Sequence, residues 1–280
     1  MLGDSSTTDE ITIQGINPIV LAACIYMLNG LFFTPIASKK NNVSIKNLGS
    51  KNLILLSMIG VAEVSALIMY FFGLKDSTAI NASILSNAEI IFSILIVMIV
   101  FQEKIRKNEL VPFLMMIIGI IILPITYELY KNDLNMSSFL LGDILIILSG
   151  LFYAIDVNLS KYVSNKIDAK RITQITSFSS GLFALLIIVI FNIPFNINLN
   201  DILPISFLAF VGTGIATLFF VMALKLLGGV KTISLYSTTS IFGIIFSSII
   251  LLEEITLIDI VSVTIAISGI YLMRSKLGNE

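Results

Sequence analysis

The stretch from Ala79 to Glu103 reads AINASILSNAEIIFSILIVMIVFQE, and it decides the fold class of this chain. It is apolar over about the length that crosses a bilayer, and charged residues follow it directly. One carboxylate, Glu89, lies near its middle. The helical spacing of Ser83, Ser86 and Ser93 predicts a continuous polar stripe that includes this carboxylate. A charge at that depth costs about 2.5–3.5 kcal/mol, so we expect it to face protein or water and not lipid.

A second stretch of the chain has the same organisation. Residues from Thr232 to Thr256 read TISLYSTTSIFGIIFSSIILLEEIT. When Glu254 is set on Glu103, the apolar runs match throughout. In this register Ser240 falls on Glu89. Agreement over a whole apolar segment predicts an internal repeat.

The composition places the whole chain in a membrane. Of the 280 residues, 56% are hydrophobic and 12% are charged, and the mean hydropathy of +0.99 fits no soluble class. We therefore expect an all-α, polytopic membrane helical bundle. The net charge is −1 and Lys and Arg are scattered, which argues against a nucleic-acid partner. There is no His and a single Cys, Cys24, so we expect no disulfide, metal, cofactor or catalytic residue.

Nine apolar segments are long enough to be membrane spans. They run approximately over Asn17–Ser38, Leu53–Leu74, Ala79–Phe101, Leu110–Thr126, Leu141–Val163, Ile172–Phe191, Ile202–Leu224, Val230–Leu252 and Leu257–Met273. The fifth has no counterpart in the repeat, which gives four helices over residues 17–127 followed by five over residues 141–276. A repeat of odd length is inverted in its second copy, and inverted repeats are the architecture of secondary transporters. Residues 1–16 are polar and acidic, and we interpret them as a short extracytoplasmic tail.

The distribution of positive charge predicts the orientation. All but two of the 17 Lys and Arg residues fall in one set of alternate loops and ends, and the other set contains only Lys75 and Lys131. Cytoplasmic loops carry the excess of Lys and Arg. We therefore expect a multi-pass protein of the cell membrane with its C-terminus in the cytoplasm and its N-terminus outside.

Several of these features resemble one transporter family when they are taken in order. They are Ala82–Glu103 with its terminal Glu, Leu151–Phe152–Tyr153–Ala154, Gly212–Thr213–Gly214 followed by Ala223–Leu224–Lys225, Ile233–Glu254, and the matching helices around Gly119 and Gly269. Over nearly its whole length the chain resembles the EamA-type branch of the drug/metabolite transporter superfamily. The resemblance implies ten helices in two inverted halves of five, a central pocket, alternating access and export.

The chain departs from the family pattern in two ways. The first family helix is absent, and we interpret the start of the chain as truncated, with a nine-helix variant as the alternative. The prolines often found within the Glu-terminated helices are replaced by Glu89 and Ser240. The absence of these prolines argues against gating by broken helices at those points.

Three carboxyls, Glu63, Glu89 and Asp156, lie deep in the predicted spans, where no Lys or Arg pairs with them. Such groups serve as proton-coupling sites or cation anchors, and the alternative is a neutral carboxyl bonded to a neighbouring helix. Glu63 and Glu89 lie at similar depth on consecutive helices, so we expect them to face one pocket. No second carboxyl is placed beside Asp156 by the sequence. The other residues predicted to line a substrate or coupling site are Asn87, Tyr153, Tyr236, Thr239 and Ser240.

These observations favour a secondary transporter of a small neutral, zwitterionic or cationic metabolite, with proton coupling at the buried carboxyls. A nucleotide-sugar or phosphate-ester antiporter is the first alternative, but its anionic cargo calls for Lys or Arg within the spans. An intramembrane enzyme is the second. Its aspartate motifs are incomplete here, because Gly142–Asp143 lacks a preceding glycine and Tyr153 stands three residues from Asp156.

The predicted orientation can be tested by labelling. In a variant without Cys24, single cysteines in the loops Lys39–Lys51 and Ser164–Arg171 should resist impermeant thiol reagents added to intact cells, because both loops are predicted to be cytoplasmic. A cysteine next to Lys131 serves as the accessible control. Strong labelling of the first two loops would contradict the orientation.

Overall fold

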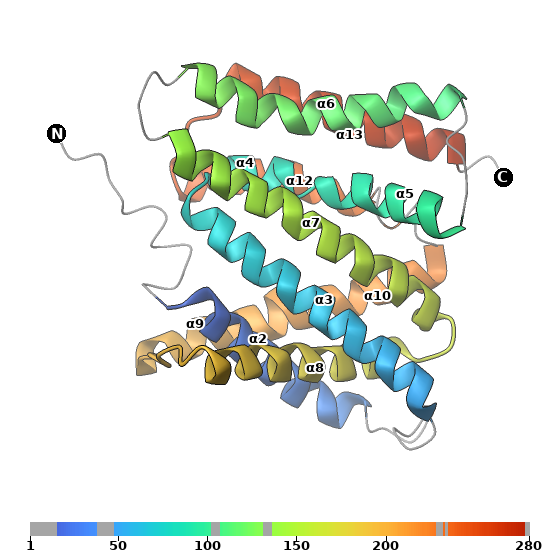
Figure 1. The fold of residues 1–280 in the computed structure, drawn as a ribbon, viewed down its shortest axis with the longest axis vertical. Helices are drawn as coiled ribbons and strands as arrows, with labels where there is room; N and C mark the ends of the chain where they lie inside the picture. Colours follow the sequence, from blue (N-terminus) through green and yellow to red (C-terminus); the bar gives the residue numbers. More distant parts are fainter. Residues whose placement is uncertain are drawn as a thin grey trace. The chain divides into compact units, whose positions relative to one another are not determined.

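Every regular element in the described part of the chain is helical (Figure 1). The computed structural model describes residues 16–37, 48–101, 107–130, 136–227, 232 and 235–277. Six helical segments are long and apolar enough to cross a membrane: Pro18–Ala37, Gly49–Lys75, Ala79–Ile96, Leu141–Ser164, Ala169–Ile190 and Leu199–Leu227. Shorter apolar helices cover Leu110–Ile122, Thr239–Ile250 and Leu257–Met273. The prediction of an all-α membrane protein is confirmed.

The chain divides into two compact units, which we describe separately. Unit 1 contains residues 69–154 and 230–280, and unit 2 contains residues 9–68 and 155–229. The division falls within helix α3 (Gly49–Lys75) and within helix α7 (Met136–Ser164). Each unit therefore combines segments that are far apart in the sequence.

Unit 2 is built around an antiparallel pair of helices, α2 (Pro18–Ala37) and α8 (Ala169–Ile190). A Cβ atom at Gly30 would lie 2.9 Å from the ring of Phe178, and one at Gly181 would lie 2.7 Å from the side chain of Met27. In the register that aligns Glu103 with Glu254, Gly30 aligns with Gly181 and Met27 aligns with Phe178. The contacts of α2 with α8 are therefore reciprocal.

Unit 1 contains a pair of the same kind, α6 (Lys107–Tyr130) and α13 (Leu257–Leu277), which lie side by side in Figure 1. A Cβ atom at Gly119 would lie 2.6 Å from the backbone nitrogen of Ala266. One at Gly269 would lie 2.9 Å from Met116 on the opposite helix. Setting Gly119 on Gly269 also sets Met116 on Ala266, so this pair is reciprocal as well. Glycine at the crossing lets the two backbones approach closely, which is how helices associate in membranes.

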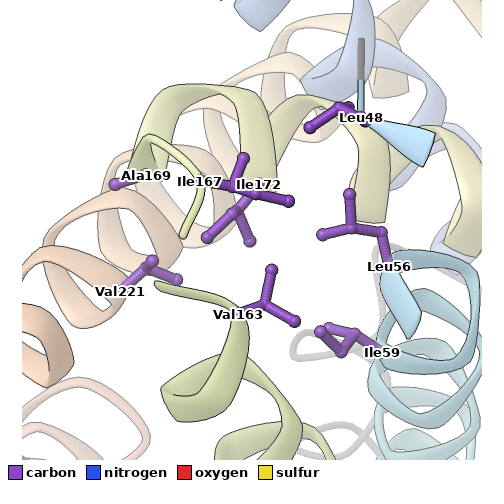
Figure 2. Close-up of a cluster of buried hydrophobic side chains, with 8 residues drawn as sticks. All are labelled: Leu48, Leu56, Ile59, Val163, Ile167, Ala169, Ile172 and Val221. Carbon is purple, nitrogen blue, oxygen red and sulfur yellow. The ribbon is translucent and has the colours of Figure 1, made fainter. Parts of the chain in front are cut away.

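An apolar cluster closes one end of unit 2 (Figure 2). It draws on α3, α7, α8 and α10 (Ala216–Leu227), together with the turn between α7 and α8. Its buried members are Leu48, Leu56, Ile59, Val163, Ile167, Ala169, Ile172 and Val221. Partly buried Leu159 and Leu218 pack against it.

The helix expected over Ala79–Phe101 is broken. It consists of α4 (Ala79–Leu85) and α5 (Ala88–Phe101), with a turn at Ser86 and Asn87. The continuous polar stripe is therefore wrong. The physical reason is local: the Ser86 hydroxyl donates to the Ser83 carbonyl oxygen at 2.9 Å, and the Asn87 amide donates to the Ile84 carbonyl oxygen at 3.0 Å. Such side-chain bonds compete with the helical ladder, so no proline is needed to interrupt it.

The second copy is interrupted at the equivalent place. Helix α12 (Thr239–Ile250) begins after a turn at Ser237 and Thr238, and the repeat register sets this turn on the first one. The Thr238 hydroxyl donates to the Leu235 carbonyl oxygen at 2.6 Å, as the Asn87 amide does to Ile84 in the first copy. Both copies are thus interrupted without a proline, and for the same reason.

The segment Leu199–Leu227 is also less regular than expected. It contains a short 3₁₀ turn η3 (Leu199–Asp201), α9 (Ile202–Phe207), a π-helical stretch η4 (Leu208–Ile215) and α10. A Cβ atom at Gly214 would clash with Asn29 and Phe33 of α2. The glycine thus permits close contact of the wide π turn with α2.

Replacement of Gly119 by Ala should lower the free energy of unfolding by about 1–3 kcal/mol, because the new methyl group meets backbone atoms of α13 that cannot move independently. Gly212→Ala is the matched control, since its Cβ would meet only Leu208 of its own segment, at 3.4 Å. Titration with sodium dodecyl sulfate in mixed micelles measures the free energy of unfolding of both variants. Equal stability of the two variants would contradict the close packing of α6 and α13.

Candidate functional site

Two carboxyls on neighbouring helices of unit 2 interact through their charges. Glu63 on α3 and Asp156 on α7 lie close enough for their charges to repel each other. Glu63 is buried and Asp156 is partly buried. The sequence places no carboxyl beside Asp156, but the folding of unit 2 brings α7 next to α3 across a long separation in sequence. The other predicted carboxyl, Glu89, belongs to unit 1.

Hydroxyl groups from three further helices surround the Glu63 carboxyl. The hydroxyl oxygens of Ser180 on α8 and Thr217 on α10 each lie 3.5 Å from it, and the Tyr26 hydroxyl of α2 also bonds to it. None of these three residues was predicted as part of a site. The available signal was that each is a polar side chain within an otherwise apolar segment, which in a membrane is expected to meet a polar partner.

The close approach of α3 and α8 places Glu63 among these hydroxyls. A Cβ atom at Gly60 would lie 2.6 Å from the carbonyl oxygen of Thr176. The Ser180 hydroxyl lies 2.8 Å from the carbonyl oxygens of both Gly60 and Thr176 and shares its one proton between them. Gly60 is three positions before Glu63 and therefore lies on nearly the same face of α3. The glycine thus sets how closely Ser180 approaches the carboxyl.

Asp156 is held from its own helix. The buried Ser160, one turn further along α7, donates to its carboxylate at 2.8 Å. Tyr153, one turn before it, is partly buried and shares that side of the helix, as the sequence predicted. The geometry around Asp156 leaves its carboxylate less enclosed than that of Glu63.

The surroundings of the two carboxyls are apolar on one side. Ile59 and Val163 of the apolar cluster lie one and two turns away from them along α3 and α7, towards the α7–α8 turn. Val221 lies one turn from Thr217 on α10 in the same direction. A dry border of this kind keeps the local dielectric low and strengthens every electrostatic interaction of the site.

A buried positive charge in unit 2 lies where a loop was expected. Arg171, assigned to the basic loop from the sequence, falls in the first turn of α8 and is buried. Its guanidinium donates to the Ala37 carbonyl oxygen at 2.8 Å and to Gln174 at 2.6 Å. Cations are favoured at the C-terminal end of a helix, and Ala37 ends α2. The Arg171 guanidinium therefore stabilises the C-terminal end of α2.

Glu89 lies in unit 1, in the first turn of α5, and is buried. Its backbone nitrogen packs against α7, where a Cβ atom at Gly150 would lie 2.8 Å from it. An acidic side chain in a first turn is favoured by the helix dipole. The break between α4 and α5, which the sequence did not predict, creates this environment, so a structural role for Glu89 has its own physical basis.

The two interrupted helices are bonded to each other within unit 1. The Asn87 amide donates to the Ser240 hydroxyl at 2.8 Å, and both side chains are buried. The structure thus brings together two of the predicted lining residues. The other two, Tyr236 and Thr239, are exposed, and the Thr239 hydroxyl donates to the Tyr236 carbonyl oxygen at 2.7 Å.

Two further carboxyls of unit 1 have local structural partners. Glu253 accepts hydrogen bonds from the backbone nitrogens of Ala79 and Ile80, at 3.0 and 2.9 Å, and so caps α4. The fully buried Asp143 accepts one from the Ser77 hydroxyl at 2.5 Å. Within the described ranges, no cluster of three or more His, Cys, Asp or Glu side chains could hold a metal ion.

The fold and these groups define a class: an all-helical, multi-pass membrane protein built from a duplicated domain. The model of the EamA-like transporter family matches the chain twice, over residues 5–124 and 140–275. The chain therefore belongs to the EamA-like transporter family of the drug/metabolite transporter superfamily. This confirms the resemblance seen in the sequence and the prediction of a transporter and not an enzyme.

Two comparisons agree with this assignment. The chain is 26% identical to an uncharacterized transporter of Methanothermobacter thermautotrophicus, in an alignment that covers 97% of this chain and 82% of that protein. A solved crystal structure with 11% identity superposes with a TM-score of 0.69 over 98% of this chain and 95% of its own. The second comparison shows a shared fold.

Replacement of Asn87 by Ala should destabilise the protein by about 0.5–2 kcal/mol, because the Ser240 hydroxyl then loses its buried partner. Thr239→Ala, which removes an exposed hydroxyl, should have little effect. In a double-mutant cycle, Asn87→Ala and Ser240→Ala should show a coupling of about 0.6 kcal/mol in unfolding titrations. Strictly additive effects would argue against this contact.

Proposed function

We propose that this EamA-like transporter is a secondary transporter that exports or exchanges a small neutral, zwitterionic or cationic metabolite, in exchange for protons and by alternating access. The observation that carries the proposal is the pairing of Glu63 with Asp156 on two membrane-spanning helices. Ionisable groups at membrane depth are costly, and they mark substrate and proton pathways.

The reciprocal contacts support the inverted arrangement that alternating access requires. Within unit 2, Thr34 of α2 meets Gln174 of α8, whereas Asn29 meets Ser177, so the two helices run in opposite directions. Equivalent residues that exchange contacts across an antiparallel pair are related by a two-fold axis perpendicular to the helices. For helices that span a bilayer, such an axis lies in the membrane plane, as in inverted-repeat transporters.

The interrupted helices give a second, independent support. The helix is interrupted at the same position in both copies of the repeat. The first break includes Asn87, and the second comes shortly before Ser240. Discontinuous helices near the centre of the membrane are a recurring feature of transporter sites. We infer two transporter repeats over residues 17–127 and 141–276, in a cell-membrane protein whose Lys- and Arg-rich loops and C-terminus are cytoplasmic.

The charges of the site favour cationic or zwitterionic cargo over phosphate esters. The repulsion that acts on the Glu63 carboxyl comes from Asp156, a second acid. The buried guanidinium of Arg171 is committed to the end of α2. A phosphate group would therefore meet two carboxyls and, among the described residues of unit 2, no buried cation that is not already bonded, which costs several kcal/mol in a low-dielectric site.

Purified protein in liposomes with an acidic interior should take up small amines or amino acids faster than at equal pH, because outward proton flow drives cargo inward. Protein-free liposomes with the same gradient are the essential control, since neutral amines diffuse in and are trapped by acid. Glycerol phosphate tests the antiporter alternative. Uptake of glycerol phosphate alone, or rates equal to protein-free liposomes for every solute, would contradict the proposal.

A further inference from the structure

The carboxyls of Glu63 and Asp156 are enclosed to different degrees. Glu63 is 5% exposed, and hydroxyls from three helices contact it. Asp156 is partly exposed and accepts one hydrogen bond from Ser160 of its own helix. Asp156 is therefore the less enclosed residue of the two.

The charged groups on the packed helices offer this pair no counter-ion. The groups that surround Glu63 are the Asp156 carboxyl of α7, the Tyr26 phenol of α2 and the hydroxyls of Ser180 and Thr217 on α8 and α10. Among the described cations of unit 2, Arg171 bonds to the end of α2, and the Lys side chains of α3, α7, α8 and α10 are exposed: Lys51, Lys161, Lys170 and Lys225. A pair of carboxylates in this setting requires a cation from outside.

A proton and an ammonium group can each supply that cation, but not together. One proton shared by the pair removes the repulsion between the carboxyls. An ammonium group that binds the ionised pair does the same through charge-assisted hydrogen bonds. Once the ammonium is bound, the proton has no favourable place and leaves to water, so the net charge of the site is unchanged.

On the basis of the proposed function, we propose that Glu63 and Asp156 form a single exchange site for one proton or one primary ammonium group of the cargo. Glu63 holds the proton, and Asp156 makes the direct contact with the ammonium. The hydroxyls of Tyr26, Ser180 and Thr217 are positioning groups for Glu63.

The acceptor atoms around the site favour a primary ammonium over a quaternary one. Carboxylate and hydroxyl oxygens accept N–H hydrogen bonds, and an –NH₃⁺ group offers three of them. A quaternary ammonium offers none and is bound best by the faces of aromatic rings. Ethylammonium and tetramethylammonium, which carry the same charge, therefore form a matched pair of probes.

The first test uses the unmutated protein in detergent, so it does not depend on the folding of a variant. Dicyclohexylcarbodiimide reacts with protonated carboxyls in apolar surroundings, and mass spectrometry of peptides locates the product. Labelling at Glu63 should slow when ethylammonium is added and when the pH is raised, and tetramethylammonium should have no effect. A labelling rate at Glu63 that does not change with ethylammonium, or equal protection by both probes, would overturn the proposal.

The second test measures proton release, with a pH indicator in weakly buffered solution, when ethylammonium is added. The wild type should release one proton per bound ammonium. Glu63→Gln should bind the probe without releasing a proton, and Asp156→Asn should require about ten- to hundredfold more probe. Glu254→Gln, which changes an exposed carboxyl, is the control. Unchanged binding and proton release in Asp156→Asn would overturn the division of roles.

These results separate the inference from the proposed function. If liposomes that contain the protein transport a solute in exchange for protons, but ethylammonium changes neither the labelling of Glu63 nor the release of protons, the proposed exchange site is wrong. The proposed transport function is then unaffected. If ethylammonium protects Glu63 but no solute is transported in exchange for protons, the proposed function fails while the cation site remains.

Discussion

The structure depends on glycine-mediated contact between antiparallel helices. In a bilayer there is little hydrophobic gain in bringing two apolar helices together, so association relies on close packing and on bonds between helices. Gly30 and Gly181 provide this contact in unit 2, and Gly119 and Gly269 provide it in unit 1. The same principle at Gly60 brings α8 against α3, and this determines the distance from Ser180 to the Glu63 carboxyl. The chemistry of the candidate site thus follows from the packing of backbones.

Much of the fold could be predicted because its signals are strong. Long apolar segments and a low content of charge identify membrane helices, and the match of Ala79–Glu103 with Thr232–Thr256 identifies the duplication. Depth along a segment also identified Glu63, Glu89 and Asp156 as unusual. These inferences need only the position of a residue within its own segment, and for that the sequence is sufficient.

The partners of these residues could not be predicted, because they depend on which helix faces are turned toward each other. Glu63 and Asp156 are far apart in the chain, and no spacing rule links them. The helix breaks were missed for a different reason. Asn87 and Thr238 are compatible with a helix when they point outward, and they interrupt it only when their side chains bond to the preceding turn. The sequence assigns Arg171 to a loop, because a cation at the boundary of an apolar segment is typical of a loop. Its position in α8 depends on its bond to the end of α2, which the sequence does not give.

The scaffold is nearly symmetric, whereas its chemistry is not. Glu89 aligns with Ser240 in the register that sets Glu103 on Glu254, and Glu63 aligns with Thr213 in the register that sets Gly119 on Gly269, so each acid corresponds to a neutral residue in the other copy. A symmetric set of carboxyls would double the charge that must be neutralised inside a low-dielectric bundle, and each further unpaired charge costs several kcal/mol. Neutral residues at the positions that correspond to Glu63 and Glu89 keep that cost within what a single cation can offset. Duplication therefore supplies the two-fold framework, and divergence at a few buried positions supplies the site.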